Sequence, residues 1–221
     1  MMKKIFFILV VLFCFITGVY KAFFYFERKS ELEEQIANKS VSRLSAEELG
    51  KIQPGDIILR RGFGFFSDFI ADNLNDGDID VTHAGIIVKK QDSLFVIHSL
   101  SSDMSAVDGM QQQPLQDFLQ YSAPGKIIIT RAKTADSSTG NNIARQAEYY
   151  LKQEIPFDHK GKFDDDTALY CTEMIWKILE KDLKIVTLPQ EVTARKAFFF
   201  SMMPMYDTNY FDIIINQYET K

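Results

Sequence analysis

The chain has 221 residues, 46% of them hydrophobic, and a formal net charge of -5 at pH 7. This length is enough for one domain with a full hydrophobic core and a short extra segment. The basic residues are scattered along a mildly acidic chain, which excludes a basic surface of the kind that binds nucleic acid. Two cysteines, Cys14 and Cys171, are too few for a disulfide framework or a cysteine-rich zinc site.

The N-terminus carries a targeting signal. Lys3 and Lys4 precede sixteen residues without a charge, and the apolar character continues beyond Lys21 as AFFYF. No small-residue cleavage site follows, which favours an uncleaved signal anchor over residues 1–26; export after signal cleavage is the alternative. The N-terminal lysines predict an extracytoplasmic domain, although basic residues also follow the apolar run. Bulky residues before Cys14 disfavour lipid attachment there.

Residues 27–48 are charged and helix-favouring, so we predict a helical linker that leads into a domain over residues 49–221. A Pro-Gly turn predicts a first strand from about Asp56. Two β-branched runs, VTHAGIIV and LFVIHSL, flank a polar segment and predict a hairpin. GKIIITRA is typical of a further strand. The segments 61–80 and 101–114 between these elements are expected to be loops that shape a cleft.

The pattern changes to helical spacing from Asn141 onward. NNIARQAEYYLKQ predicts one helix, and TALYCTEMIWKILEKDL predicts a second after Pro156 and an acidic loop. Strands followed by helices indicate an α+β fold rather than alternating units with a parallel sheet. The aromatic and methionine-rich tail from Ile185 is expected to pack on the domain.

Cys171 admits two interpretations. Ile175, Ile178 and Leu179 follow it at helical spacing, so the cysteine begins the apolar stripe of a core helix. The acidic residues before Thr167 are good caps, which would place Cys171 in about the first turn. There, free N–H groups and the helix dipole favour a thiolate and can receive an oxyanion. A nearby base would favour this catalytic interpretation.

His83 and His98 are candidate bases because both lie on the predicted hairpin. The two-residue period of a strand allows them to share a face with Gly85. A two-residue loop of Lys90 and Gln91 would set the histidines directly opposite each other, and a longer or bulged loop would move them to a diagonal offset. Gly85 is expected to leave open space on this face.

A metal centre built from Asp158, His159, Asp164 and Asp166 is conceivable in the acidic loop. The spacing matches neither an EF-hand loop nor a zinc motif, and solvated acids near a helix N-terminus explain the same residues more simply. We therefore expect no metal. No glycine-rich phosphate loop or nucleotide fingerprint occurs in the sequence, so no cofactor is expected either.

Four segments together resemble the permuted papain-like amidases, the YiiX group of the NlpC-type superfamily: PGDIILR, THAGIIV, FVIHS and FDDDTALYCTEM. The resemblance covers roughly residues 53–183. It implies a circularly permuted papain-like fold, in which an antiparallel sheet carrying the histidines packs against a helix carrying the cysteine. The apolar N-terminal segment adds a membrane helix to this expected fold. The resemblance also implies Cys171 as the nucleophile, His83 as the base and His98 as the third member, where relatives often have Glu.

The implied reaction is attack on a carbonyl carbon by Cys171, followed by hydrolysis of an acyl-enzyme. The N–H of Cys171 is the candidate oxyanion donor, and Tyr170 is a supporting residue. The expected partners are a peptide or lipid-like small substrate, with a cell-wall peptide amide as the first candidate, and the membrane at the N-terminal segment. Lipid-ester hydrolysis or acyl transfer is the alternative suggested by the apolar KAFFFSMMPMY. A non-catalytic binding module is a third.

Overall fold

The computed structural model describes residues 2–75, 79–133, 138–161, 167–187 and 202–218. The elements in chain order are α1 (Met2–Ala37), α2 (Ala46–Lys51), β1 (Ile57–Arg60), α3 (Gly64–Leu74), β2 (His83–Lys90), β3 (Ser93–Leu100), β4 (Gly109–Pro114), α4 (Leu115–Gln120), β5 (Ile127–Ala132), α5 (Thr139–Lys152), α6 (Cys171–Trp176), the π-helical segment η1 (Lys177–Asp182), the 3-10 turn η2 (Met203–Tyr206) and β6 (Phe211–Asn216). The strands form one antiparallel sheet in the order β4-β3-β2-β1-β5-β6.

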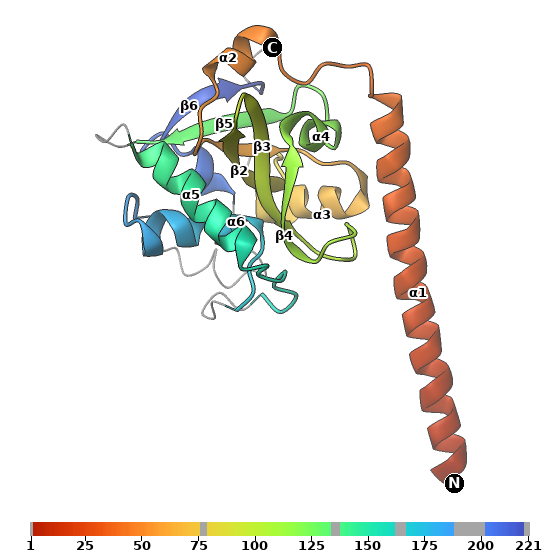
Figure 1. The fold of residues 1–221 in the computed structure, drawn as a ribbon. Helices are drawn as coiled ribbons and strands as arrows, with labels where there is room; N and C mark the ends of the chain where they lie inside the picture. Colours follow the sequence, from red (N-terminus) through yellow and green to blue (C-terminus); the bar gives the residue numbers. More distant parts are fainter. Residues whose placement is uncertain (1, 76–78, 134–137, 162–166, 188–201, 219–221) are drawn as a thin grey trace.

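The two faces of the sheet belong to different apolar clusters. On β2, Ala84 and Ile86 pack in the cluster that contains α5 and α6, whereas Ile87 packs with α4. Figure 1 shows α5 and α6 together against the sheet, away from α4. His83 alternates with Ala84 and so shares the side of Ile87, where the α4 ring of Phe118 lies 5.7 Å from the imidazole ring.

The predicted α+β class is confirmed, with an antiparallel sheet that carries both histidines and a helix that carries the cysteine. The expected strands appear as β1, β2, β3 and β5, and the expected helices as α5 and α6. The second helix changes to π-helical geometry at Lys177. The apolar stripe below Cys171 is core, because Ile175, Ile178 and Leu179 are fully buried.

Two elements lie where loops were expected, and a strand lies in the tail, for which no element was predicted. The segment 61–80 contains α3, the segment 101–114 contains β4, and the tail contains β6. The sequence of β4, GMQQQP, has a weak strand signal, so its pairing with β3 decides its conformation. The run FDIIIN was a readable signal for β6. The tail packs on the domain as expected, since Met202 and Met205 are buried; residues 196–201 of KAFFFSMMPMY lie outside the described chain.

The hairpin loop lies one residue further along the chain than the Lys90–Gln91 loop that would set the histidines directly opposite each other. Lys90 pairs with Ser93, so the loop is the two residues between them. The first of these, Gln91, has a φ of 54°, the left-handed conformation that a two-residue hairpin loop needs at this position. The resulting register offsets His83 from His98 by two residues. A shift of two keeps both side chains on one face, so the histidines become diagonal neighbours rather than directly opposed.

The helix α1 is continuous from Met2 to Ala37, and its apolar part has a mean hydropathy of 2.4. It is long and apolar enough to cross a membrane, as is a signal sequence. Figure 1 shows its N-terminal half projecting away from the domain. The helix has no break near residue 26, so it does not mark where the anchor would end and the linker begin. The division of the chain at residues 26 and 48 therefore stays a prediction.

The C-terminal half of α1 packs on the domain through polar contacts. The buried carboxylate of Glu27 accepts hydrogen bonds from the backbone N–H groups of Phe65 and Phe66, at 3.1 and 2.8 Å. It thereby satisfies free donors in the first turn of α3. Arg28 donates to the carbonyl oxygens of Ser102 and Asp103, at 2.6 and 2.5 Å. These contacts join α1 to the β3–β4 connection, which forms part of the site described below.

Candidate active site

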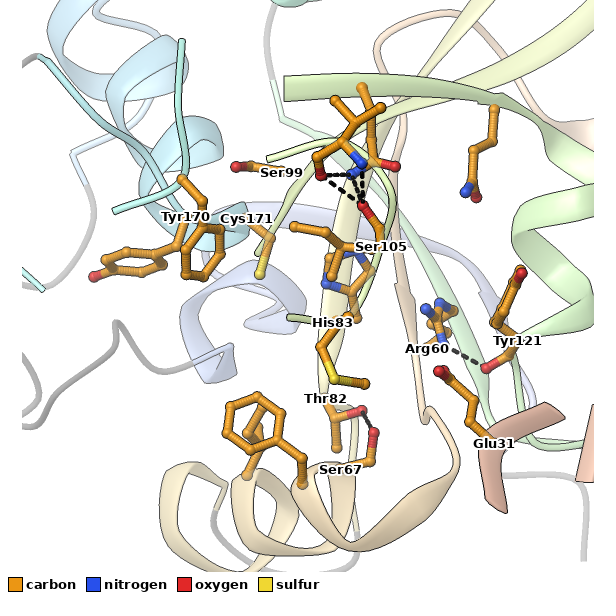
Figure 2. A pocket seen from close by; sticks show the side chains of 18 of the residues that line it. Glu31, Arg60, Ser67, Thr82, His83, Ser99, Ser105, Tyr121, Tyr170 and Cys171 are labelled. Atoms are coloured by element: carbon orange, nitrogen blue, oxygen red, sulfur yellow. Dashed lines mark hydrogen bonds between the residues drawn. The ribbon is translucent and has the colours of Figure 1, made fainter. Parts of the chain in front are cut away.

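A cavity of about 430 Å³ lies at the start of β2. It is lined by side chains from α1, α3, β1, the β3–β4 connection and the N-terminus of α6. Cys171 and His83 both line it, and Figure 2 shows the sulfur of Cys171 and the His83 side chain directed into the same space. The fold therefore brings together two residues that are far apart in the sequence.

Cys171 is the first residue of α6. Tyr170 is its N-cap, and the backbone N–H of Tyr170 donates to Oε2 of the buried Glu173, at 3.3 Å. The hydroxyl of Ser99 on β3 donates to the carbonyl oxygen of Leu169, at 2.6 Å, which holds the segment before the helix. The helix begins later than the predicted cap at residues 164–167; residues 164–166 lie outside the described chain. The first-turn position of Cys171 is nevertheless confirmed.

Burial raises the pKa of the Cys171 thiol. The backbone N–H groups of Ala84, Thr172 and Cys171 itself oppose this shift, as does the positive charge of Arg60, but burial outweighs them. The N–H groups at the helix terminus lower the pKa of the thiol, as expected from the sequence, but burial raises it by more. Deprotonation of Cys171 requires a base.

His83 and His98 form a buried pair. Nε2 of His83 lies 2.9 Å from Nδ1 of His98, and the His98 ring packs 5.2 Å from the Phe118 ring. His98 is only 1% exposed and lies behind His83 as seen from the cavity. Since His83 has two ring nitrogens and Nε2 is engaged, Nδ1 is the nitrogen available to Cys171.

Both imidazoles are neutral at physiological pH. Burial lowers the pKa of His83 well below its ordinary value, and the charges of Arg60 and His98 lower it further. Burial and Arg60 likewise lower the pKa of His98 to about 3, although the side-chain amide of Gln113 opposes the shift. Nε2 of His98 nevertheless has no hydrogen-bond partner of good geometry among the described residues. The sequence alone did not reveal Gln113, because its place beside His98 depends on the β3–β4 pairing.

Gly85 does not leave open space on this face, contrary to expectation. A Cβ atom there would lie 2.4 Å from Cγ1 of Val96 and 3.3 Å from Cβ of His98. The neighbouring strand β3 already fills the position. Gly85 therefore permits the close approach of β2 and β3 that brings His98 to His83.

Tyr170 is buried and lines the cavity, which is consistent with a supporting position. Its backbone N–H is directed to Glu173, so this group is not a free oxyanion donor. The N–H of Cys171, at the first helical position, remains the candidate donor.

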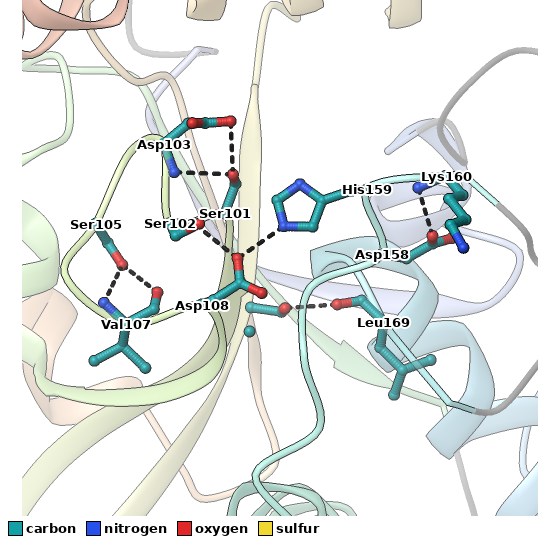
Figure 3. A network of polar contacts seen from close by, with 12 residues as sticks. Ser101, Ser102, Asp103, Ser105, Val107, Asp108, Asp158, His159, Lys160 and Leu169 are labelled. Carbon is teal, nitrogen blue, oxygen red and sulfur yellow. Dashed lines mark hydrogen bonds and ion pairs between the residues drawn. The ribbon is translucent and has the colours of Figure 1, made fainter. Parts of the chain in front are cut away.

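The β3–β4 connection that walls the cavity is held by Asp108. Figure 3 shows its carboxylate between two partners: Oδ1 accepts from the Ser102 N–H and contacts Nε2 of His159, each at 2.8 Å. Ser105 Oγ bonds within the same connection, donating to the carbonyl oxygen of Val107 and accepting from its N–H. Through its contact with Asp108, His159 therefore links the β3–β4 connection to the segment that precedes α6.

Alkylation of Cys171 by iodoacetamide is expected to keep accelerating above about pH 9. Only the thiolate reacts, and the raised pKa of Cys171 means that its fraction still grows where an exposed cysteine has levelled off. No inflection is expected between about pH 6 and 8, because His83 is already neutral there. Mass spectrometry of the Cys14→Ala protein measures this rate at the single remaining thiol. A plateau at acidic pH would instead indicate a preformed thiolate–imidazolium pair.

Comparison with known proteins places this chain in a family and shows its likeness to solved structures, one of which is described here. The sequence matches the model of a family described as "permuted papain-like amidase enzyme, YaeF/YiiX, C92 family" over residues 51–209. The solved structure is that of the "metalloprotein yiiX from Escherichia coli O157:H7", which is 19% identical, with a TM-score of 0.58 and 75% of this chain and 98% of that chain covered. This likeness shows a shared fold. No curated protein matches the sequence.

The Escherichia coli protein is described as a metalloprotein. In the described parts of the present chain, no group of three or more His, Cys, Asp and Glu side chains could hold a metal ion. Of the four residues considered from the sequence, His159 contacts Asp108, and Asp158 accepts from the N–H of Lys160 at 2.7 Å. The other two, Asp164 and Asp166, lie outside the described residues. The described residues do not fit a metal centre.

Proposed function

This chain belongs to the permuted papain-like amidase family, a family of cysteine-type hydrolases, and on that premise we propose that it hydrolyses an amide through an acyl-enzyme on Cys171. One observation carries this proposal. Cys171, at the first position of α6, and His83, at the start of β2, line one cavity, with His98 against the far nitrogen of His83. A nucleophile, a base and an orienting group are the parts that covalent catalysis needs.

The tautomers follow from the contacts. His83 can accept the thiol proton at Nδ1 only if its resting proton is on Nε2. The Nε2–H group then donates a hydrogen bond to Nδ1 of His98. His98 then carries its proton at Nε2, toward the side of Gln113. The resting pair is a neutral thiol and a neutral imidazole, and the proton moves to His83 as the sulfur attacks the carbonyl carbon.

The rest of the cycle uses the same groups. The oxyanion that develops during attack is received by the N–H of Cys171. His83 returns its proton to the leaving amine, which breaks the C–N bond and leaves a thioester. A water molecule, deprotonated by His83, then releases the acid and restores the thiol. The charge of Arg60 favours the thiolate and opposes the imidazolium, so it acts on both partners of the first step.

The substrate class in this proposal is a peptide amide of the cell wall, met outside the cytoplasm by a membrane-anchored enzyme. Two features support a site close to the membrane: α1 is long and apolar enough to span a bilayer, and its residues Arg28 and Glu31 line the cavity. The positions of the N-terminal lysines support the orientation with the domain outside.

A second candidate is hydrolysis or acyl transfer on a lipid ester. The observation that favours it is the apolar character of much of the cavity wall, to which Phe66, Ile70, Phe157 and Met202 contribute. An acyl chain fits such a lining as well as a peptide side chain does.

The test is detection of the acyl-enzyme on the full chain in detergent. The protein is mixed with muropeptides or with phospholipid vesicles, quenched in acid and examined by mass spectrometry. A thioester on Cys171 with amine release from muropeptides supports the amidase. A fatty-acyl adduct formed only with vesicles supports the lipid alternative, and no adduct with either contradicts both.

A further inference from the structure

The Arg60 guanidinium is a buried cation with unused hydrogen-bond donors. Arg60 is 6% exposed and lines the cavity. One nitrogen donates to the carbonyl oxygen of Tyr121, and the guanidinium carbon lies 4.9 Å from the centre of the Phe118 ring. Its Nε has no hydrogen-bond partner among the described residues. A buried charge with an unpaired donor is costly, so the position favours a ligand that supplies a further acceptor.

The nearby carboxylate of Glu31 does not satisfy Arg60. Figure 2 shows Glu31, from α1, beside Arg60 and Tyr121. The two charges influence each other, yet they form no ion pair within the described contacts. Burial raises the pKa of the Glu31 carboxyl, and the charges of Arg60 and Arg28 oppose this shift. Arg60 itself stays charged, because burial lowers its pKa only to about 10.

We propose that Arg60 is a carboxylate-binding subsite, so that the substrate carries a free carboxylate a few bonds from the carbonyl carbon attacked by Cys171. This inference rests on the proposed function and names its substrate class: amides cleaved next to a terminal carboxylate. Internal amide bonds of a long chain lack such a group and are poor substrates.

The placement of Arg60 supports this distance. Arg60 on β1 pairs directly with His83 on β2, which sets the two side chains about 5 Å apart at their bases. Its charge also acts on the sulfur of Cys171. The planar guanidinium fits a carboxylate with two parallel hydrogen bonds. A phosphate dianion suits the site less well. Arg28 also lines the cavity, but it already donates to two carbonyl oxygens, and the nearby Glu31 carboxylate disfavours a second negative charge.

Two alkylating reagents of nearly the same shape test the subsite without a known substrate. Iodoacetate bears a carboxylate and iodoacetamide an amide; with either, an S–C bond forms at Cys171 and iodide leaves. We compare the ratio of their rates in the full-length Cys14→Ala protein in detergent. Arg60→Gln is expected to lower the iodoacetate/iodoacetamide ratio about tenfold, the size of one charge-assisted contact. Arg60→Lys is expected to retain most of it.

The matched control is Arg61→Gln. Arg61 is the next residue, but its guanidinium pairs with Asp68 and Asp80 and does not line the cavity. Its ratio should equal that of the parent protein. Glu31→Gln should raise the ratio, because a competing negative charge is removed. An unchanged ratio in Arg60→Gln overturns the subsite, since the ratio cancels any general change in the reactivity of Cys171.

A binding measurement separates the subsite from catalysis. Acetate binding to the Cys171→Ala protein, followed by saturation-transfer NMR, should be lost in Cys171→Ala/Arg60→Gln. Equal binding in both proteins overturns the subsite even if Cys171 labels too slowly to compare. If no acyl-enzyme forms with any substrate, the proposed function is contradicted. The carboxylate subsite is judged separately, by the iodoacetate/iodoacetamide ratio and by acetate binding.

Discussion

Replacement of Cys171 by alanine is expected to lower amide hydrolysis by about 10⁴-fold or more, because the covalent route is lost with the sulfur. The fold should survive, since Cys171 is only partly buried and its side chain faces a cavity rather than closely packed core. Initial rates of amine release from muropeptides measure the loss, and a thermal melt measures the fold.

The control for this substitution is Cys14→Ala. Cys14 is exposed on the apolar half of α1, far in sequence from the cavity. Its replacement should leave the rate unchanged. If the Cys171→Ala protein keeps more than a small fraction of the activity, covalent catalysis by Cys171 is contradicted.

Replacement of His83 by alanine is expected to lower the rate by about 10³-fold, the usual contribution of a positioned base. The raised pKa of Cys171 makes this dependence strong, because the thiol does not ionise on its own at neutral pH. The rate of the His83→Ala protein should therefore rise with pH as hydroxide replaces the base. Steady-state kinetics between about pH 6 and 10 measure this change.

Two substitutions of His98 distinguish a role in orienting His83 from a role in packing. His98→Ala removes the acceptor for Nε2 of His83, and the rate should fall by about 10²-fold. His98→Asn offers an amide oxygen near the same place and should recover much of the loss. If alanine and asparagine are equally damaging at equal stability, His98 acts through packing against Phe118 rather than through a hydrogen bond.

The neutral His–His pair has a chemical consequence. A carboxylate behind His83 would stabilise the imidazolium and favour a resting ion pair, whereas His98 does not. Arg60 is buried on the paired strand β1, and its charge lowers the pKa of His83, as burial also does. In the proposed reaction, the raised pKa of Cys171 and the lowered pKa of His83 both favour the proton on sulfur before the substrate is attacked. A carboxylate bound at Arg60 would partly neutralise its charge and so reduce the lowering of the His83 pKa. Substrate binding would thereby make His83 a stronger base.

Much of the fold follows from local patterns in the sequence. The β-branched runs predicted four of the strands, and helical spacing predicted α5 and α6. These signals are local, because alternation and caps depend on neighbouring residues. The missed elements have weak local signals or depend on pairing: α3 is capped by Glu27 from a distant helix, and the polar β4 becomes a strand only beside β3.

For the site, the sequence by itself determined the chemical types: one cysteine at a helix start, two histidines on a hairpin, and motifs that resemble an amidase family. Only the tertiary structure decided how they act together. The hairpin register moved His98 to a diagonal contact, burial raised the pKa of Cys171 against the effect of the helix terminus, and strand pairing put Arg60 beside His83. The physical reason is that desolvation and contacts between distant segments arise when the chain packs, and no local pattern encodes them.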